Sequence, residues 1–317
     1  MSGFPVGQAN KNASTLGIAA AFLALLFWGG QAVIAKGVDI DPLPLVFMRI
    51  WIAAAWSIGF LYATGGKLTV RILRISVWGG IAFGFDLVLF FTALKLTTIA
   101  NATVISSIQP VLLVFAAPIL FKERVQVSDM GWALIAIVGV AVVVFGSSGV
   151  PAWSPAGDLW AVLTLFAWTS YFMASKAART RLSAAEFTAA GTTVAAVVVS
   201  PFALLSGQEW VVPTSTEWFW IAAMAIGPGW GGHYLMNWAL GYIPIWLGGT
   251  TALAIPVVST LMAAAFIGEA FNGIQAAGMG ISIGALVAIT LRSQRQPNNS
   301  ADPGPDLVGQ DPATDQP

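Results

Sequence analysis

Long apolar stretches alternate with short polar, glycine- or proline-containing breaks along most of the chain. A helix of about 20 predominantly apolar residues is long enough to cross a bilayer. Stretches of roughly that length recur ten times, with few charged residues inside them. The pattern therefore predicts an all-α integral membrane protein with ten transmembrane helices, at residues 16–36, 43–64, 76–97, 101–121, 128–147, 157–177, 184–205, 216–240, 245–268 and 272–291.

The composition agrees with this class of protein and excludes several others. Hydrophobic residues make up 57% of the chain and charged residues 9%, whereas soluble domains carry about 25% charged residues. The net charge of zero suggests no nucleic-acid partner, and the absence of cysteine excludes disulfides and thiolate metal sites. No zinc-binding His-Glu-x-x-His motif or phosphate loop is present, so we expect no metal site and no cofactor.

A second pattern is an internal repeat with an offset of 146 residues. The offset relates Pro110 to Pro256, Glu123 to Glu269, and an Ala-Leu pair at position 93 to one at position 239. Repeats of this length in apolar chains are typical of transporters built from two like halves. We expect two repeat domains flanked by a cytoplasmic N-terminal segment and a disordered cytoplasmic tail, at residues 16–147, 157–291, 1–15 and 292–317.

The distribution of basic residues predicts the orientation of the two halves. With the N-terminus in the cytoplasm, eleven Lys and Arg residues fall on the cytoplasmic side and two on the outer side. This bias predicts a multi-pass plasma (inner) membrane protein with both termini in the cytoplasm. Each half has five spans, so the second half enters the membrane from the opposite side and the repeat is inverted. Glu123 is then expected at the cytoplasmic face and Glu269 at the outer face.

These motifs resemble the EamA type of the drug/metabolite transporter superfamily. The resemblance rests on Arg49 and on the two related stretches that run from Phe91 to Glu123 and from Trp238 to Glu269. It covers about residues 16 to 291. The resemblance implies ten helices around a central cavity, alternating access, and export of small metabolites such as amino acids. The run of glycines at 227–232 departs from the first copy.

Charged groups inside spans indicate where chemistry takes place, because hydrocarbon disfavours them strongly. Asp86 lies near the middle of the third predicted span and can bind a substrate amine or carry a proton; the alternative is a structural partner for Arg49. Arg49 can hold a carboxylate, but its match to the family favours a structural or gating role.

The repeat offset relates Gly84–Asp86 to Trp230–Gly232. In the eighth span this stretch directly precedes the polar residues His233, Tyr234 and Asn237. We expect a broken helix here, whose freed backbone groups a substrate can use. The neighbouring candidates for the cavity wall are His233, the single histidine of the chain, and Trp230, Tyr234 and Asn237. For a lone histidine, hydrogen bonding between helices is the alternative to a functional role.

Other polar and aromatic positions complete the predicted site. Trp28 and Gln31 in the first span, Trp168 and Tyr171 in the sixth, and Gln109 before the repeated proline are candidates for the cavity wall. For the repeated residues we expect structural or gating roles: kinks at the prolines, and capping or ion pairing at the glutamates, namely Pro110, Pro256, Glu123 and Glu269.

The sequence predicts a secondary transporter for a small-molecule substrate, and not an enzyme. A non-transporting receptor or scaffold is one alternative. An intramembrane protease is another, but Asp86 is the only deeply placed acid, and the Gly-Ser-Ser-Gly sequence at 146–149 falls in a predicted turn. The substrate, the coupling ion, the net direction and the oligomeric state stay open at this point.

Overall fold

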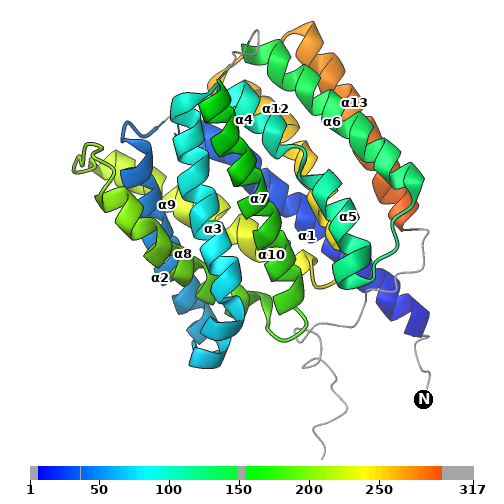
Figure 1. Ribbon diagram of the computed structural model, residues 1–317, viewed down its shortest axis with the longest axis horizontal. Coiled ribbons are helices and arrows are strands. Elements are labelled where there is room, and N and C mark those ends of the chain that lie inside the picture. The colour runs from blue at the N-terminus through cyan, green and yellow to red at the C-terminus, as the bar shows by residue number, and fades with distance from the viewer. Residues whose placement is uncertain (1–5, 36, 149–153, 295–317) are drawn as a thin grey trace, which may run out of the picture.

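The computed structural model describes residues 6–35, 37–148 and 154–294, and all regular elements among them are helices (Figure 1). In chain order they are α1 (Val6–Ala35), α2 (Pro42–Ala63), α3 (Val70–Leu96), α4 (Ile99–Ser106), α5 (Gln109–Phe121), α6 (Val127–Ser148), α7 (Pro155–Ala178), α8 (Ala184–Leu204), α9 (Ser215–Ile226), the π-helix η1 (Gly227–Gly232), α10 (His233–Ala239), α11 (Ile245–Thr251), the 3-10 turn η2 (Ala252–Ala254), α12 (Ile255–Ile267) and α13 (Gly273–Ser293).

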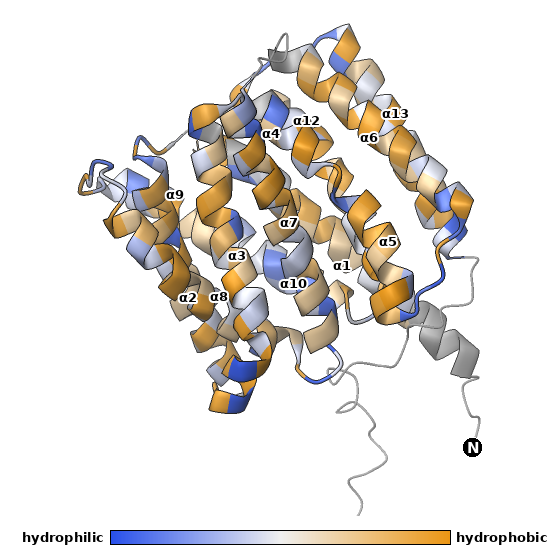
Figure 2. Ribbon diagram, viewed as in Figure 1, coloured by the Kyte–Doolittle hydropathy of each residue, from blue (hydrophilic) through white to orange (hydrophobic). Residues whose placement is uncertain are grey.

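These elements form ten membrane spans, because α4–α5, α9–η1–α10 and α11–η2–α12 each make one span. Eight of the ten are long and apolar enough to be recognised as spans by length and hydropathy alone. The other two are α7, which carries Asp158 and Lys176 near its ends, and α9–η1–α10, which the π-helix interrupts. The helices are mostly hydrophobic along their lengths, and polar segments gather at their ends and around α10 (Figure 2).

The repeat seen in the sequence is also a repeat of structure. Helices α5 and α12 both have 13 residues and begin 146 positions apart. Each ends in a left-handed residue, Lys122 with φ 54° and Gly268 with φ 67°. The next N–H, of Glu123 or Glu269, then donates to a carbonyl in the last turn at 3.2 Å in both copies. The predicted fold of ten helices in two inverted five-helix repeats is confirmed.

Three details differ from the sequence expectations. Helix α1 begins at Val6, so it includes most of the segment 1–15 that was expected to precede the first span. The glycine-containing run 227–232 does not unwind the helix but forms a π-helical turn, which is wider than an α-turn. The expected disordered tail falls largely on residues 295–317, outside the described residues.

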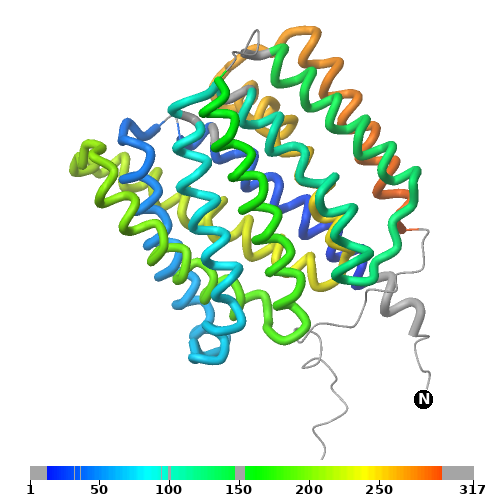
Figure 3. The backbone as a smooth tube through the Cα atoms, in the orientation of Figure 1, coloured from blue at the N-terminus to red at the C-terminus, as the bar shows by residue number. Residues whose placement is uncertain are grey.

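The two halves pack against each other mainly through α3 with α7 and α8, and through α6 with α13. Helix α3 lies in the middle of the bundle and packs against α7 and α8, which belong to the other half. Helices α6 and α13 form a long antiparallel pair along one edge (Figures 1 and 3). Their backbones approach so closely that a Cβ atom on Gly139 would lie 2.6 Å from the Ser282 nitrogen. Small residues allow such contacts in membranes, where dispersion forces and not the hydrophobic effect join helices.

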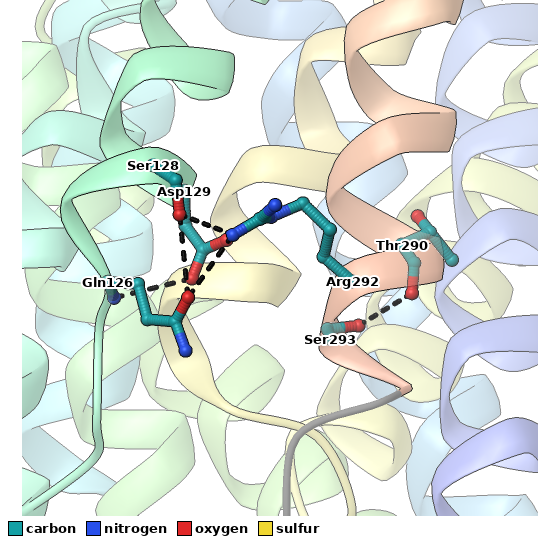
Figure 4. A network of polar contacts seen from close by, with 6 residues as sticks. All are labelled: Gln126, Ser128, Asp129, Thr290, Arg292 and Ser293. Carbon is teal, nitrogen blue, oxygen red and sulfur yellow. Dashed lines mark hydrogen bonds and ion pairs between the residues drawn. The ribbon is translucent and has the colours of Figure 1, made fainter.

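A polar cluster holds one end of this helix pair together (Figure 4). Asp129 is buried at the start of α6 and accepts hydrogen bonds from the Gln126 N–H at 3.3 Å and from Arg292 Nε of α13 at 3.4 Å. The Arg292 guanidinium also donates to the side chains of Gln126 and Ser128. In the second repeat, Gln275 takes the place of Asp129 and caps α13 by accepting the Asn272 N–H at 2.9 Å, but its neutral amide cannot form an ion pair. The two ends therefore differ by one charged contact.

Removing the Asp129 carboxylate tests how much that contact contributes. We expect Asp129→Ala to lower the free energy of unfolding by about 1–2 kcal/mol, because a helix cap and a partly buried charged hydrogen bond are both lost. The matched Gln275→Ala change removes a cap alone and should cost about 0.5–1 kcal/mol. Thermal unfolding in detergent gives the order of the two midpoints. Adding Arg292→Ala to Asp129→Ala should change little; fully additive effects would show that the two side chains do not stabilise each other.

Candidate substrate cavity

A cavity of about 290 Å³ lies between the two halves, close to the lower limit of small-molecule sites, which span about 300–1,000 Å³. Both repeats contribute to its wall, and helix breaks of both repeats face it. The lining residues are Trp28 and Gln31 of α1, Arg49 of α2, Phe83, Asp86, Leu87, Phe90 and Phe91 of α3, Thr103, Ser106, Ser107, Gln109 and Pro110 of α4–α5, Thr164 and Trp168 of α7, His233 of α10, and Gly249, Ala252, Leu253, Ile255 and Pro256 of α11–η2–α12.

Two opposite charges face this cavity. Arg49 and Asp86 are close enough to influence each other electrostatically, yet no direct ion pair or hydrogen bond joins them in the part of the chain that the structure describes. The Arg49 guanidinium lies over the Phe91 ring, 5.5 Å from its centroid, which is a cation–π distance. The two charges therefore both line the cavity without a direct ion pair between them.

A third polar group at the wall is the side-chain amide of Gln109. This residue is 2% exposed and begins α5 immediately before Pro110. Its Nε2 is buried and has no hydrogen-bond partner among the described residues. An unpaired buried donor costs about 1–3 kcal/mol, so Gln109 is a lining residue whose side-chain amide the described residues leave without a hydrogen bond.

Aromatic rings form another part of the wall, around His233. The centroid of the imidazole lies 4.4 Å from Phe83, 5.2 Å from Trp28 and 5.8 Å from Trp168. The Trp28 indole N–H is directed away to the carbonyl of Pro228 at 3.2 Å. Gly232 leaves the space for this indole, since a Cβ at that position would lie 2.6 Å from Trp28 Nε1. The cavity is thus lined by both aromatic rings and charged groups.

Behind the aromatic wall lies a fully buried polar network centred on Asn237. Its Oδ1 accepts hydrogen bonds from Tyr171 at 3.0 Å and Ser175 at 2.7 Å, and its Nδ2 donates to Thr188 at 2.9 Å. Tyr171 Oη in turn lies 3.2 Å from Nδ1 of His233. The network joins α7, α8 and α10, and reaches the cavity only through His233.

The structure places six of the ten predicted cavity residues at the wall, together with Arg49, for which a structural or gating role was expected. Four others lie elsewhere, contrary to expectation. Tyr171 and Asn237 are behind the wall and fully buried. Trp230 and Tyr234 stack on each other at 5.4 Å and pack against Phe60 of α2, away from the cavity. The seven at the wall are Trp28, Gln31, Arg49, Asp86, Gln109, Trp168 and His233.

Sequence reasoning also missed part of the wall. It assigned structural or gating roles to Pro110 and Pro256, although the helix breaks around them line the cavity. Phe83 and Phe90 were missed as well, although they stand three residues before and four residues after Asp86. Positions at these spacings share one face of a helix, and this spacing was the signal that could have found them.

The end of the bundle near Glu123 is closed. The Glu123 carboxylate accepts the backbone N–H of Ile245, the first residue of α11, at 3.0 and 2.9 Å. It also lies 3.4 Å from Lys176 Nζ, which donates to the Ile243 carbonyl at 2.8 Å. Burial raises the pKa of the Glu123 carboxyl above its usual value, whereas Lys176 and the Ile245 N–H act in the opposite direction. These bonds connect the two repeats across one end of the cavity.

The opposite end is more open. Beneath the cavity, towards Glu123, the side chains are fully buried: Leu113, Leu240, Trp246 and Leu247. Helices α5 and α11 pack closely there, but the related pair α12 and α4 does not do so in the described chain. Glu269, the repeat mate of Glu123, is exposed. The cavity therefore lies in the half of the bundle away from Glu123.

No cluster of three or more potential metal-ligating side chains occurs in the described ranges, and the wall lacks the donor set that a metal centre needs. What the wall offers is one cation, one anion, one free amide and a row of aromatic rings. This combination suits reversible binding of an amphipathic molecule and has no paired acid and base for hydrolysis.

The sequence matches known transporters. Residues 15–145 and 155–291 each match the EamA-like transporter family. The chain is 27% identical to the aromatic amino acid exporter YddG of Ancylobacter novellus over 285 residues, 86% of this chain and 96% of that protein. It is 23% identical to the uncharacterized transporter YxxF of Bacillus subtilis over 207 residues, 61% of this chain and 66% of that protein.

A solved structure, described only as the crystal structure of a protein, has the same fold. It superposes with a TM-score of 0.76 and 26% sequence identity, over 90% of this chain and 98% of that one. The expected resemblance to the drug/metabolite transporter superfamily is thus confirmed, and so is the expectation that the chain is not an enzyme. The chain is a multi-pass membrane protein and belongs to the EamA-like transporter family.

Proposed function

We propose that this transporter exports amino acids with aromatic or large apolar side chains. The observation that supports this most directly is that Arg49 and Asp86 line the same cavity as several aromatic rings. An α-amino acid carries a carboxylate and an ammonium group on the same carbon atom, so both charges must be recognised within one small site. Arg49 would hold the carboxylate, with a further hydrogen bond from Gln109, and Asp86 would hold the ammonium group. The aromatic walls would contact the side chain.

The name of one relative supports the same substrate class. The protein from Ancylobacter novellus that is 27% identical to this chain is called an aromatic amino acid exporter. Export is the direction we propose for this chain also. Because the chain belongs to a transporter family, no observation favours a receptor, a scaffold or a protease.

We further propose that the Glu123 end faces the cytoplasm. Eleven of the fourteen basic residues fall on the cytoplasmic side of the predicted topology, which is also the side predicted for Glu123. Both termini, including residues 1–15 and 292–317, would then be cytoplasmic. In this orientation the described conformation is open to the outside and closed to the cytoplasm. Release of the Glu123 contacts and closure near Glu269 would give the opposite state, as the inverted repeat allows.

Transport measurements with an Asp86 variant test the substrate assignment. Purified protein in lipid vesicles should take up labelled L-tryptophan, L-tyrosine and L-phenylalanine faster than protein-free vesicles. Asp86→Asn should reduce the rate by about tenfold or more, because a charged hydrogen bond contributes about 1.5–3 kcal/mol. Asp39→Asn removes the same charge at an exposed position outside the cavity and should leave the rate near that of the unchanged protein. Full activity of Asp86→Asn would remove Asp86 from the binding site.

A variant of Glu123 tests the closed end. Glu123→Gln keeps one acceptor for the Ile245 N–H but removes the charge that pairs with Lys176, so the end should open more often. Because the chain has no cysteine, a single Leu247→Cys change reports on opening: Leu247 is 1% exposed in the closed state. Labelling by an impermeant maleimide from the Glu123 side should be about tenfold faster with Glu123→Gln.

The control for this measurement is Glu186→Gln. Glu186 caps α8 at the same end of the bundle, through the Ser183 N–H at 2.7 Å, and does not connect α5 to α11. It should leave the labelling rate unchanged. Equal rates in the Glu123→Gln and Glu186→Gln proteins would show that Glu123 does not hold the end closed.

A further inference from the structure

His233 differs from the other polar residues at the cavity because its hydrogen bonds define which ring nitrogen faces the substrate. Nδ1 points to Tyr171, which lies behind the wall, at 3.2 Å. The structure records no hydrogen bond for Nε2 with the residues that it describes, and the ring itself lines the cavity. The cavity side of the imidazole is therefore the Nε2 side.

The network behind the wall determines where the imidazole proton lies. The Tyr171 hydroxyl donates its only proton to Asn237 Oδ1 at 3.0 Å. In this orientation the amide of Asn237 donates from Nδ2 to Thr188 Oγ1 at 2.9 Å. Since the Tyr171 proton is already used, its oxygen can only accept from His233, and Nδ1 must carry the hydrogen. In the neutral ring, Nε2 is then unprotonated.

We propose that His233 presents Nε2 to the cavity as a hydrogen-bond acceptor and so selects for a ring N–H or O–H on the substrate. This inference rests on the proposed function and refines it: indole and phenol side chains should be favoured over phenyl. His233 is the residue that contacts the substrate, and Tyr171 and Asn237 are positioning residues that act through it.

The surroundings of His233 favour recognition of a planar donor. Phe83, Trp28 and Trp168 surround the imidazole at 4.4 to 5.8 Å and present ring faces and edges to the cavity. The N–H of Trp28 is occupied by Pro228, so this indole offers no donor of its own to Nε2. A bound indole in contact with these rings would supply the missing donor. A phenyl ring would leave the acceptor without a partner, which costs binding free energy.

The first experiment measures the tautomer itself. The chain has a single histidine, so ¹⁵N labelling of histidine in protein without a purification tag gives the signals of one imidazole. At pH 8, where an imidazole is neutral, we expect a protonated Nδ1 and an unprotonated Nε2. Tyr171→Phe removes the acceptor for Nδ1–H and should shift the tautomer towards Nε2–H. Tyr62→Phe, at an exposed position on α2, should change nothing.

The second experiment measures selectivity in vesicles. L-Tryptophan should compete for transport about tenfold better than 1-methyl-L-tryptophan, which lacks the indole N–H. His233→Phe keeps an aromatic ring but removes the acceptor, so the preference should fall to about one while L-phenylalanine is still transported. Transport of L-phenylalanine also shows that the variant is folded. Tyr171→Phe should lower the same preference through the tautomer.

Each outcome decides the inference. An Nε2–H tautomer in the unchanged protein, which the reversed Asn237 amide would produce, overturns it while amino acid transport and the proposed function stand. An unprotonated Nε2 with the same preference in the His233→Phe protein also overturns it. If no amino acid is transported by the unchanged protein, the proposed function fails, and the role in selectivity fails with it whatever the tautomer.

Discussion

The structure depends on one constraint: hydrocarbon offers no partner for an unpaired polar group. Backbone breaks and charges inside the membrane must therefore face a cavity or be paired within the protein. The protein meets both conditions. The breaks before Pro110 and Pro256, and the charges Arg49 and Asp86, line the cavity. The buried amide of Asn237 is bonded through both its oxygen and its nitrogen.

The same constraint explains why two similar halves produce a molecule with two different ends. The repeats share their caps, kinks and left-handed turns, so they provide the same scaffold in opposite orientations. Their ends differ in the contacts that the repeated glutamates make. The Glu123 carboxylate caps α11 in the described conformation, whereas its mate Glu269 is exposed. We interpret the different contacts of Glu123 and Glu269 as a feature of the described conformation, and the elements that the repeats share as features of the fold.

Much of the fold was predictable from sequence because its signals are local. Apolar runs of about 20 residues, with glycine, proline or charge at their ends, place most of the spans to within a few residues. The first apolar span begins at Ala13, close to the predicted residue 16, whereas helix α1 itself begins at Val6, because its first ten residues are largely polar and hydropathy does not mark them. The inverted repeat followed from spacing and basic residues.

The cavity was only partly predictable, for a different physical reason. Transmembrane helices are apolar on all sides, so periodicity does not say which face points inward. Asp86 and His233 were found because polar groups are rare in spans, but Phe83 and Phe90 carry no such mark. Tyr234 was misplaced because the π-helical turn at 227–232 changes the rotation of the residues that follow it. Asn237 is polar because it joins three helices, not because it faces a substrate.

The central claim is that Arg49 and Asp86 recognise the two charges of one zwitterionic substrate. Competition against labelled L-tryptophan uptake in vesicles tests this most directly, with tryptamine, which lacks the carboxylate, and indole-3-propionate, which lacks the ammonium group. We expect each compound to compete at least about tenfold less well than unlabelled L-tryptophan, because one charge of the pair is left without its partner. If either compound competes as strongly as L-tryptophan, the pair does not act as a zwitterion site.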